Sequence, residues 1–164
     1  MKFRYMLPLF IAAFLVQSTL LNELRLFGVT PNLILCLVAV FSFWFDGPAA
    51  AGLGIFFGLL QDLCFGELIG TAALVLYLIS QGIRMIKHLF YRDNLLSVFF
   101  ISLLSTAVYE LVYWLIQAVM GGTAHILYML SILPLLLIYN CLATVVMYLI
   151  FRRRLIKHPR DRYV

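Results

Sequence analysis

The chain has 164 residues, of which 65% are hydrophobic and 12% are charged, and its formal net charge is +5. A soluble domain is about 45–50% apolar, and a small one leaves much of its surface in water, so this composition excludes an ordinary soluble domain. The length allows one compact membrane domain. The excess of Lys and Arg over Asp and Glu does not indicate a nucleic-acid partner, because the basic residues flank apolar segments. In that position they are explained by contact with anionic lipid headgroups and by the orientation of the chain in the membrane.

Six apolar segments predict an all-α polytopic membrane protein with six transmembrane helices. In chain order the segments span about residues 5–21, 30–45, 48–63, 69–83, 95–120 and 126–151. We therefore expect a six-helix transmembrane domain over residues 1–151 and a basic cytoplasmic tail over residues 152–164. The first segment follows Lys2 and Arg4 as in a signal peptide, but no small-residue cleavage site comes after it, so we interpret it as an uncleaved helix.

The segments also carry local signals for their ends and bends. Pro8 falls in the first turn of the first segment, where a missing N–H has little cost. Thr30 is the expected N-cap of the second segment, and Pro31 its first helical residue. Pro134 is expected to kink the sixth segment. The second and third segments are shorter than the roughly 20 residues of a spanning helix, so two full helices are the favoured interpretation and a re-entrant hairpin is the alternative.

The distribution of basic residues predicts the orientation. With the N-terminus in the cytoplasm, eleven of the twelve Lys and Arg residues lie inside and only Arg25 lies outside, as the positive-inside rule requires. Both termini are then cytoplasmic. The inner positions are Lys2, Arg4, Arg84, Lys87, Arg92, Arg152, Arg153, Arg154, Lys157, Arg160 and Arg162.

Glu110 is the most unusual residue, because it lies inside the fifth apolar segment. A carboxylate at mid-membrane costs about 2.5–3.5 kcal/mol on insertion scales, so it should face protein. It is either a proton or substrate site or a hydrogen-bonded packing residue; packing is favoured because no intramembrane Lys or Arg partner is visible. With Gln61 and Gln17 it forms a candidate intramembrane polar site in the outer half of the bundle, which either lines a pocket open to the outside or marks helix ends at the interface.

Small residues recur at every fourth position of the third segment. Ala50, Gly54 and Gly58 lead to Asp62, and Gly54-x-x-x-Gly58 is the small-x-x-x-small pattern that lets helix backbones approach closely. The stripe is therefore a candidate contact face. It serves either packing within the bundle, which is favoured, or a partner's helix.

A basic surface is expected on the cytoplasmic side. Arg84 and Lys87 lie on one side of an amphipathic extension of the fourth segment, which anchors to lipid headgroups or docks a partner. The candidate basic surface consists of Arg84, Lys87, Arg92, Arg152, Arg153 and Arg154.

Motifs for catalysis or metal binding are missing from the sequence. The three cysteines are far apart without a CxxC pair, and the three histidines have no ligand spacing. Neither a GxSxG motif nor a P-loop is present. We therefore expect neither an enzyme nor a cofactor.

Several short motifs, in their order and spacing, resemble a known family. They are Leu7-Pro8, Gln17-Ser18-Thr19-Leu20-Leu21, Gly28-Val29-Thr30-Pro31-Asn32-Leu33, Gly47-Pro48, Gly58-Leu59-Leu60-Gln61-Asp62-Leu63 with Gly66 and Gly70, Phe90-Tyr91-Arg92-Asp93-Asn94, Tyr109-Glu110-Leu111, and Pro134 with Asn140. Over nearly its whole length the chain resembles the bacterial rod shape-determining protein family MreD. Gln61, where similar sequences often have an apolar residue, and Thr71 are mild departures.

The resemblance implies a non-catalytic scaffold of the cell-elongation (rod) complex in the bacterial cytoplasmic membrane, supporting cell shape and peptidoglycan synthesis. It implies MreC as the direct partner, with MreB, RodA and a class-B penicillin-binding transpeptidase as associated proteins. It also implies the fold of the substrate-binding components of energy-coupling-factor transporters, so a vitamin-like small-molecule-binding component is the alternative function. The close-packing faces and the basic surface favour the scaffold, because few aromatic donors are aimed at a pocket.

Overall fold

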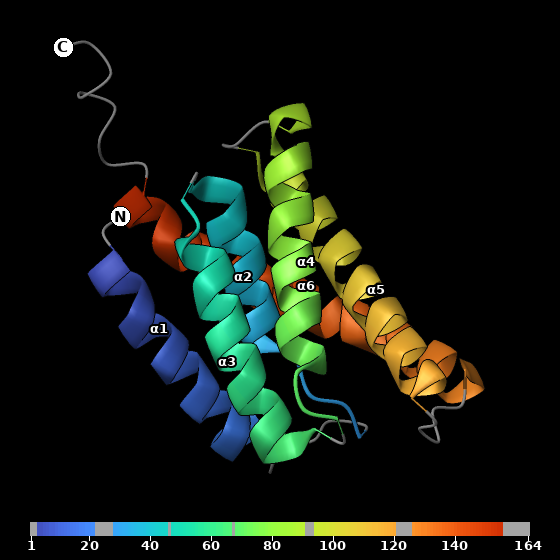
Figure 1. Ribbon diagram of the computed structural model, residues 1–164. Helices are drawn as coiled ribbons and strands as arrows, with labels where there is room; N and C mark the ends of the chain where they lie inside the picture. The colour runs from blue at the N-terminus through green and yellow to red at the C-terminus, as the bar shows by residue number, and fades with distance from the viewer. Residues whose placement is uncertain are drawn as a thin grey trace, which may run out of the picture.

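The computed structural model describes residues 3–21, 28–45, 47–66, 68–90, 94–120 and 126–155. Figure 1 shows a bundle of six α-helices, in which α6 crosses behind the others. In chain order the helices are α1 (Phe3–Val16) with the π-helical turn η1 (Gln17–Leu21), α2 (Leu33–Trp44), α3 (Ala49–Phe65), α4 (Thr71–Ile86) with the 3-10 turn η2 (Lys87–Leu89), α5 (Leu95–Val119) and α6 (Ile126–Leu155).

Two helices in the described part of the chain are long and apolar enough to cross a membrane by length and composition. They are Leu95–Val119, which is α5, and Met129–Phe151 within α6. Met6–Thr19, Leu33–Trp44 and Ala49–Phe65 are apolar but shorter. The all-helical architecture that the apolar segments predict is therefore confirmed.

The shortest helix, α2, forms the centre of the bundle. All ten residues from 34 to 43 are buried, and α2 contacts each of the other five α-helices. A helix that is apolar on all sides must be buried in protein or in lipid, and here the other helices surround it. Its 12 residues span about 18 Å at 1.5 Å per residue, which is less than the hydrocarbon core of a bilayer.

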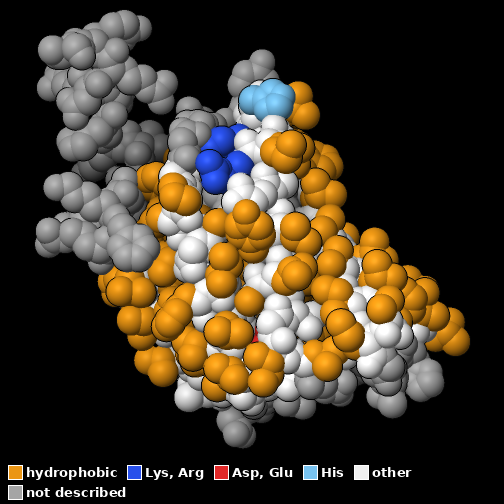
Figure 2. Space-filling model, viewed as in Figure 1, with side chains coloured by type: hydrophobic (Ala, Val, Ile, Leu, Met, Phe, Trp, Pro, Cys, Tyr) orange, Lys and Arg blue, Asp and Glu red, His pale blue; other side chains and the backbone are white. Residues whose placement is uncertain are grey.

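The outer helices bury one face and expose the other. On α6, Asn140, Thr144 and Tyr148 are buried, whereas Leu142 and Val146 are more than half exposed. Apolar side chains dominate the face drawn in Figure 2. A monomer in water rarely exposes so large an apolar surface, and lipid is the solvent that accommodates it.

The observed helix ends differ from the expected ones at several points. Asn32, not Thr30, is the N-cap of α2: its backbone is extended and its side chain accepts the N–H of Leu35 at 3.0 Å. Asn caps a helix at least as well as Thr, and Pro31 lies before the helix rather than in it. Because α1 begins at Phe3, Pro8 falls in its second turn. Helix α6 continues to Leu155, beyond the expected end at residue 151.

Candidate functional site

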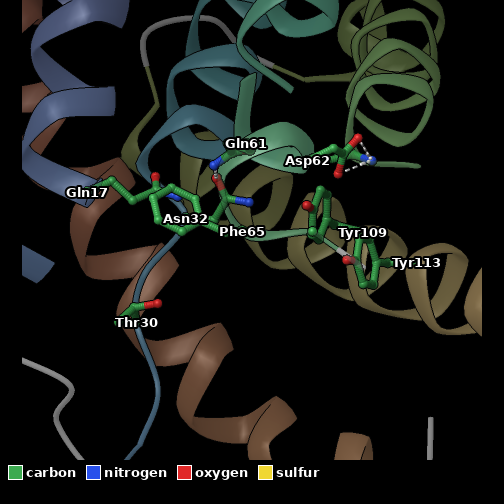
Figure 3. A pocket seen from close by; sticks show the side chains of 10 residues that line it. Gln17, Thr30, Asn32, Gln61, Asp62, Phe65, Tyr109 and Tyr113 are labelled. Atoms are coloured by element: carbon green, nitrogen blue, oxygen red, sulfur yellow. Dashed lines mark hydrogen bonds between the residues drawn. The ribbon is translucent and has the colours of Figure 1, made fainter. Parts of the chain in front are cut away.

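A polar pocket lies where α1 and α3 end and α2 and α4 begin (Figure 3). Its volume is about 250 Å³. We call this end of the bundle the polar end, and define it by Gln17, Asn32, Gln61, Asp62 and Asn140. The pocket is lined by Gln17, Thr30, Asn32, Gln61, Asp62, Phe65, Gly66, Ala72, Tyr109 and Tyr113.

The start of α2 is held by side chains from two other helical segments. Gln17, in η1, accepts the N–H of Leu33 through Oε1 at 2.8 Å. Gln61, near the end of α3, donates through Nε2 to Asn32 Oδ1 at 3.2 Å. The first N–H groups of a helix have no partner within it, so these glutamines tie α1 and α3 to the start of α2.

Asn140 joins α6 to the same point from the interior. It is 1% exposed, and its Oδ1 accepts the backbone N–H of Asn32 at 2.7 Å. Its Nδ2 donates to Thr106 Oγ1 on α5 at 3.3 Å, and its carbonyl accepts the hydroxyls of Ser102 and Thr144. Buried polar groups stabilise a fold when they are satisfied, and this network satisfies the Asn140 amide from two helices.

Asp62 caps the start of α4 from α3. Its Oδ2 accepts the N–H of Gly70 at 2.9 Å and that of Ala72 at 2.9 Å. Gly70, the N-cap residue of α4, provides no side chain for this purpose, and its φ of +96° is a left-handed conformation that favours glycine. A carboxylate also interacts favourably with the positive end of the helix dipole, so Asp62 serves as a cap supplied by a neighbouring helix.

Two tyrosines of α5 form one wall of the pocket. The rings of Tyr109 and Tyr113 are stacked, with centroids 5.8 Å apart and an interplanar angle of 15°. Gln117 donates through Nε2 to the Tyr113 hydroxyl at 3.4 Å. In Figure 3 the Tyr109 hydroxyl faces the amide of Asn32. The pocket therefore combines amide groups on one side with aromatic faces on the other.

The small-residue stripe of α3 faces the interior of the bundle. A Cβ added at Gly58 would lie 2.7 Å from Ala73 Cα on α4, and one added at Gly54 would lie 3.1 Å from Val38 Cγ2 on α2. Ala50 and Asp62 are buried as well. The stripe contacts α2 and α4 of the same chain, which favours packing within the bundle over a partner's helix at this face.

Glu110, which the sequence predicts to share a polar site with Gln17 and Gln61, lies apart from them. Gln17 and Gln61 meet at the pocket, whereas Glu110 is not among the lining residues and lies half-buried on α5, next to Tyr109 in the sequence. Asn32, Tyr109 and Tyr113 are pocket residues that the sequence analysis does not predict as site residues. Asn32 and Tyr109 belong to motifs of the family resemblance, whereas Tyr113 carries no sequence signal.

The described basic side chains lie at the opposite end of the bundle, which we call the basic end. Arg84 donates to Gln81 Oε1 at 3.2 Å, and Lys87 donates to the carbonyl of Phe45 at 3.4 Å. Figure 2 shows Lys and Arg side chains gathered at this end, above the apolar surface. Arg92 and the side chains of Arg152, Arg153 and Arg154 fall outside the described residues.

The polar side chains at the polar end of the bundle make the contacts of helix caps. Among the described residues, no group of three or more His, Cys, Asp or Glu residues is placed to hold a metal ion. Gln17, Asn32 and Asp62 direct their oxygens to backbone N–H groups, which is the arrangement of helix caps. The polar end thus connects α1, α2, α3, α4 and α6, and Asn140 extends the network to Thr106 on α5.

Comparison with known proteins identifies the family. No curated protein matches the chain. No solved structure matches it either, so the comparison does not show the transporter-component fold that the resemblance implies. The family model described as rod shape-determining protein MreD matches residues 1–157, nearly the whole chain. The chain therefore belongs to the MreD family of membrane proteins, which act in the determination of rod shape.

Proposed function

We propose that this chain is a non-catalytic scaffold of the cell-elongation complex, and that it acts by contact with an MreC partner. Its membership of the MreD family carries this proposal, because that family determines rod shape. The use of the polar end for helix capping supports it: Asp62 and Gln17 stabilise the bundle. A scaffold requires a rigid shape, and satisfied buried polar groups provide rigidity.

The proposed setting is the bacterial cytoplasmic membrane, with six spanning helices and both termini in the cytoplasm. The start of α1 and the end of α6 lie at the same end of the bundle in Figure 1, as an even number of spans requires. Arg84 and Lys87 belong to the same end, which agrees with the positive-inside rule. The polar end then faces outward.

Cysteine labelling on intact cells tests this topology. Single cysteines at Lys2, Arg160 and Gly121 would be introduced after replacement of Cys36, Cys64 and Cys141. We expect an impermeant reagent to label position 121 only. Labelling of position 121 exclusively from the cytoplasmic side would contradict the orientation.

The proposed partner is MreC, with MreB, RodA and a class-B penicillin-binding transpeptidase as associated proteins. Since the small-residue stripe of α3 is used inside the bundle, we expect the contact on other surfaces: the exposed apolar faces and the segments 22–28 and 121–125. Coexpression with MreC from the same genome, mild solubilisation and copurification test the pair. We expect a stoichiometric complex at micromolar affinity or better, about −8 kcal/mol.

The alternative function, a vitamin-binding transporter component, receives less support. Ligand pockets for drug-sized molecules measure about 300–1,000 Å³. The polar pocket measures about 250 Å³, which is below that range. If the chain purified alone and a vitamin stabilised it sharply, the scaffold proposal would be wrong.

A further inference from the structure

One exposed face of α4 changes from apolar to basic along the helix. Leu74, Tyr77 and Leu78 are between 41% and 49% exposed, and Gln81 and Arg84 follow on the same side at helical spacing. Arg84 comes ten residues after Leu74, so about 15 Å of helix separates them. Figure 2 shows the same order on the surface, with Lys and Arg side chains beyond the hydrophobic ones at the basic end. A phospholipid changes from apolar to charged over a similar length, because half of a bilayer measures about 20 Å.

A hydrogen bond holds the Arg84 guanidinium close to this face. Arg84 Nη1 donates to Oε1 of Gln81, which lies one helical turn nearer the middle of α4, at 3.2 Å. The long side chain is therefore drawn back along the helix toward the apolar part of the face, rather than outward beyond the end of α4. A guanidinium has five N–H donors in a rigid fork, and this bond uses one of them. The other donors remain for a further acceptor.

No acidic side chain in the described part of the chain pairs with Arg84. The acidic residues described there are Asp62, at the polar end, and Glu110, next in sequence to the Tyr109 that lines the polar pocket. A charge held against an apolar face in a membrane is costly unless an opposite charge pairs with it. The guanidinium fork matches the oxygens of a phosphate. This charge complementarity indicates an anionic group that comes from outside the chain.

The apolar part of the face decides which kind of anion fits. A free phosphate would pair with Arg84 and leave Leu74 and Leu78 unused, whereas an apolar helix would cover the leucines and leave the guanidinium unpaired. An anionic phospholipid meets both parts at once. Lys87, in the next turn, adds positive charge where the headgroup would lie. Its ammonium group donates to the carbonyl of Phe45, the C-cap residue of α2, at 3.4 Å.

We propose that this face of α4 binds one anionic phospholipid, whose phosphate accepts hydrogen bonds from Arg84 and whose acyl chain lies along Leu74, Tyr77 and Leu78. The headgroup then lies beside Lys87 and the end of α2, so the bound lipid stabilises the packing of α4 against the central helix. The site rests on the location of the chain in a membrane, but it is independent of the proposed contact with MreC.

Thermal unfolding of the purified full chain in detergent micelles tests the proposal. The probes are dioleoyl phosphatidylglycerol, dioleoyl phosphatidylcholine, which has the same acyl chains and no net charge, and glycerol phosphate, which is an anion without acyl chains. A ligand that binds only the folded state raises the melting temperature, and we expect a saturable rise of about 2–4 °C with phosphatidylglycerol over phosphatidylcholine. We expect no rise with glycerol phosphate. An equal rise with phosphatidylcholine or with glycerol phosphate would overturn the proposal.

Matched charge variants locate the effect. Arg84→Gln should abolish the difference between the two lipids, whereas Arg160→Gln, the same change of charge in the basic tail, should preserve it. Equal losses in the two variants would mean that the basic residues attract the lipid diffusely, and would refute the site. If Arg84→Gln does not fold, Arg84→Lys serves instead, since it keeps the charge without the fork and should lose most of the difference. A full difference in a folded Arg84 variant would also refute the site.

Copurification with MreC is measured on the same proteins, so the lipid site and the scaffold are tested separately. We expect Arg84→Gln to bind MreC as the unchanged chain does. Loss of MreC from Arg84→Gln, with the difference between the lipids intact, would assign this face of α4 to a protein partner and overturn the proposal. Failure of the unchanged chain to bind MreC would contradict the scaffold and leave the lipid site standing.

Discussion

The two ends of the bundle are held together by different forces. At the polar end, side chains such as Asp62 and Gln17 bond to the backbone of another helix. At the basic end, aromatic rings pack: Phe41 lies 5.9 Å from Phe151 and 5.8 Å from Phe45 between ring centroids. Directional bonds require particular atoms, whereas apolar packing mainly requires volume, so the polar end should tolerate substitution less well.

The largest loss of folding free energy is expected for a substitution at Gly58, which lies just inside the polar end. Gly58→Ala places a Cβ 2.7 Å from Ala73 Cα and 2.8 Å from Ala73 N, which forces α3 and α4 apart. We expect a loss of about 1–3 kcal/mol of folding free energy, seen as a lower melting temperature in detergent. Gly52→Ala is the control on the same helix, because its Cβ would meet no atom within 4 Å. Equal melting temperatures for the two variants would show that α3 and α4 are not packed as described.

The second largest loss of folding free energy is expected when the Asp62 cap is removed. Asp62→Ala leaves the N–H groups of Gly70 and Ala72 without their acceptor, at a cost of about 0.5–2 kcal/mol. Asp62→Asn should lose much less, because its oxygen can take the place of Oδ2. Phe41→Leu, at the basic end, keeps most of the buried volume and should cost less than about 1.5 kcal/mol. A larger loss in Phe41→Leu than in Asp62→Ala would reverse the comparison between the two ends.

A smaller effect is expected at a serine pair between α2 and α4. The hydroxyls of Ser42 and Ser80 are 2.8 Å apart and fully buried. Ser42→Ala should cost about 1 kcal/mol, because the Ser80 hydroxyl loses its partner. Replacing both serines with alanine should cost little more than the single change, and thermal unfolding of all three variants forms the double-mutant cycle. Strictly additive losses would mean that the two hydroxyls do not interact.

The smallest effect is expected at Glu110. Glu110→Gln keeps the shape and the hydrogen-bonding capacity of the side chain, so a packing residue should tolerate it with no measurable change in melting temperature. Rod shape in a complemented deletion strain is the second measurement, and we expect normal rods. Loss of rod shape at normal protein abundance would assign Glu110 a role in proton transfer or ligand binding instead.

Local sequence patterns predict the bounds of the helices better than they predict the contacts between helices. The apolar run that starts at Leu95 and stops before Gly121-Gly122 predicts a helix that ends at residue 120. The observed end of α5 is Val119, one residue earlier. The N-cap of α2 was misplaced because Thr30, Pro31 and Asn32 offer competing signals within three residues. The π-helical turn after Val16 had no sequence signal that we recognised.

At the candidate site, too, the sequence indicates the important residues but not the contacts that they make. Gln17, Gln61 and Asp62 stood out because polar residues are rare in apolar segments. Their roles were not predictable from the sequence, since each bonds to a particular atom of another segment: Gln17 to the Leu33 N–H, Gln61 to the Asn32 side chain, and Asp62 to the Gly70 N–H. Asn140 is the clearest case: its partner, the Asn32 N–H, lies 108 residues earlier in the chain.

The capping of α2 has a consequence for how the protein is made. The chain is synthesised from its N-terminus, so α2 enters the membrane long before Asn140 exists to accept the N–H of Asn32. Until α6 is complete, the innermost helix keeps an unpaired donor at its start and has no neighbour on its α6 side. Assembly of this bundle is therefore finished by its last helix, and a ribosome stalled before residue 140 would leave a nascent chain whose centre is exposed to quality-control proteases.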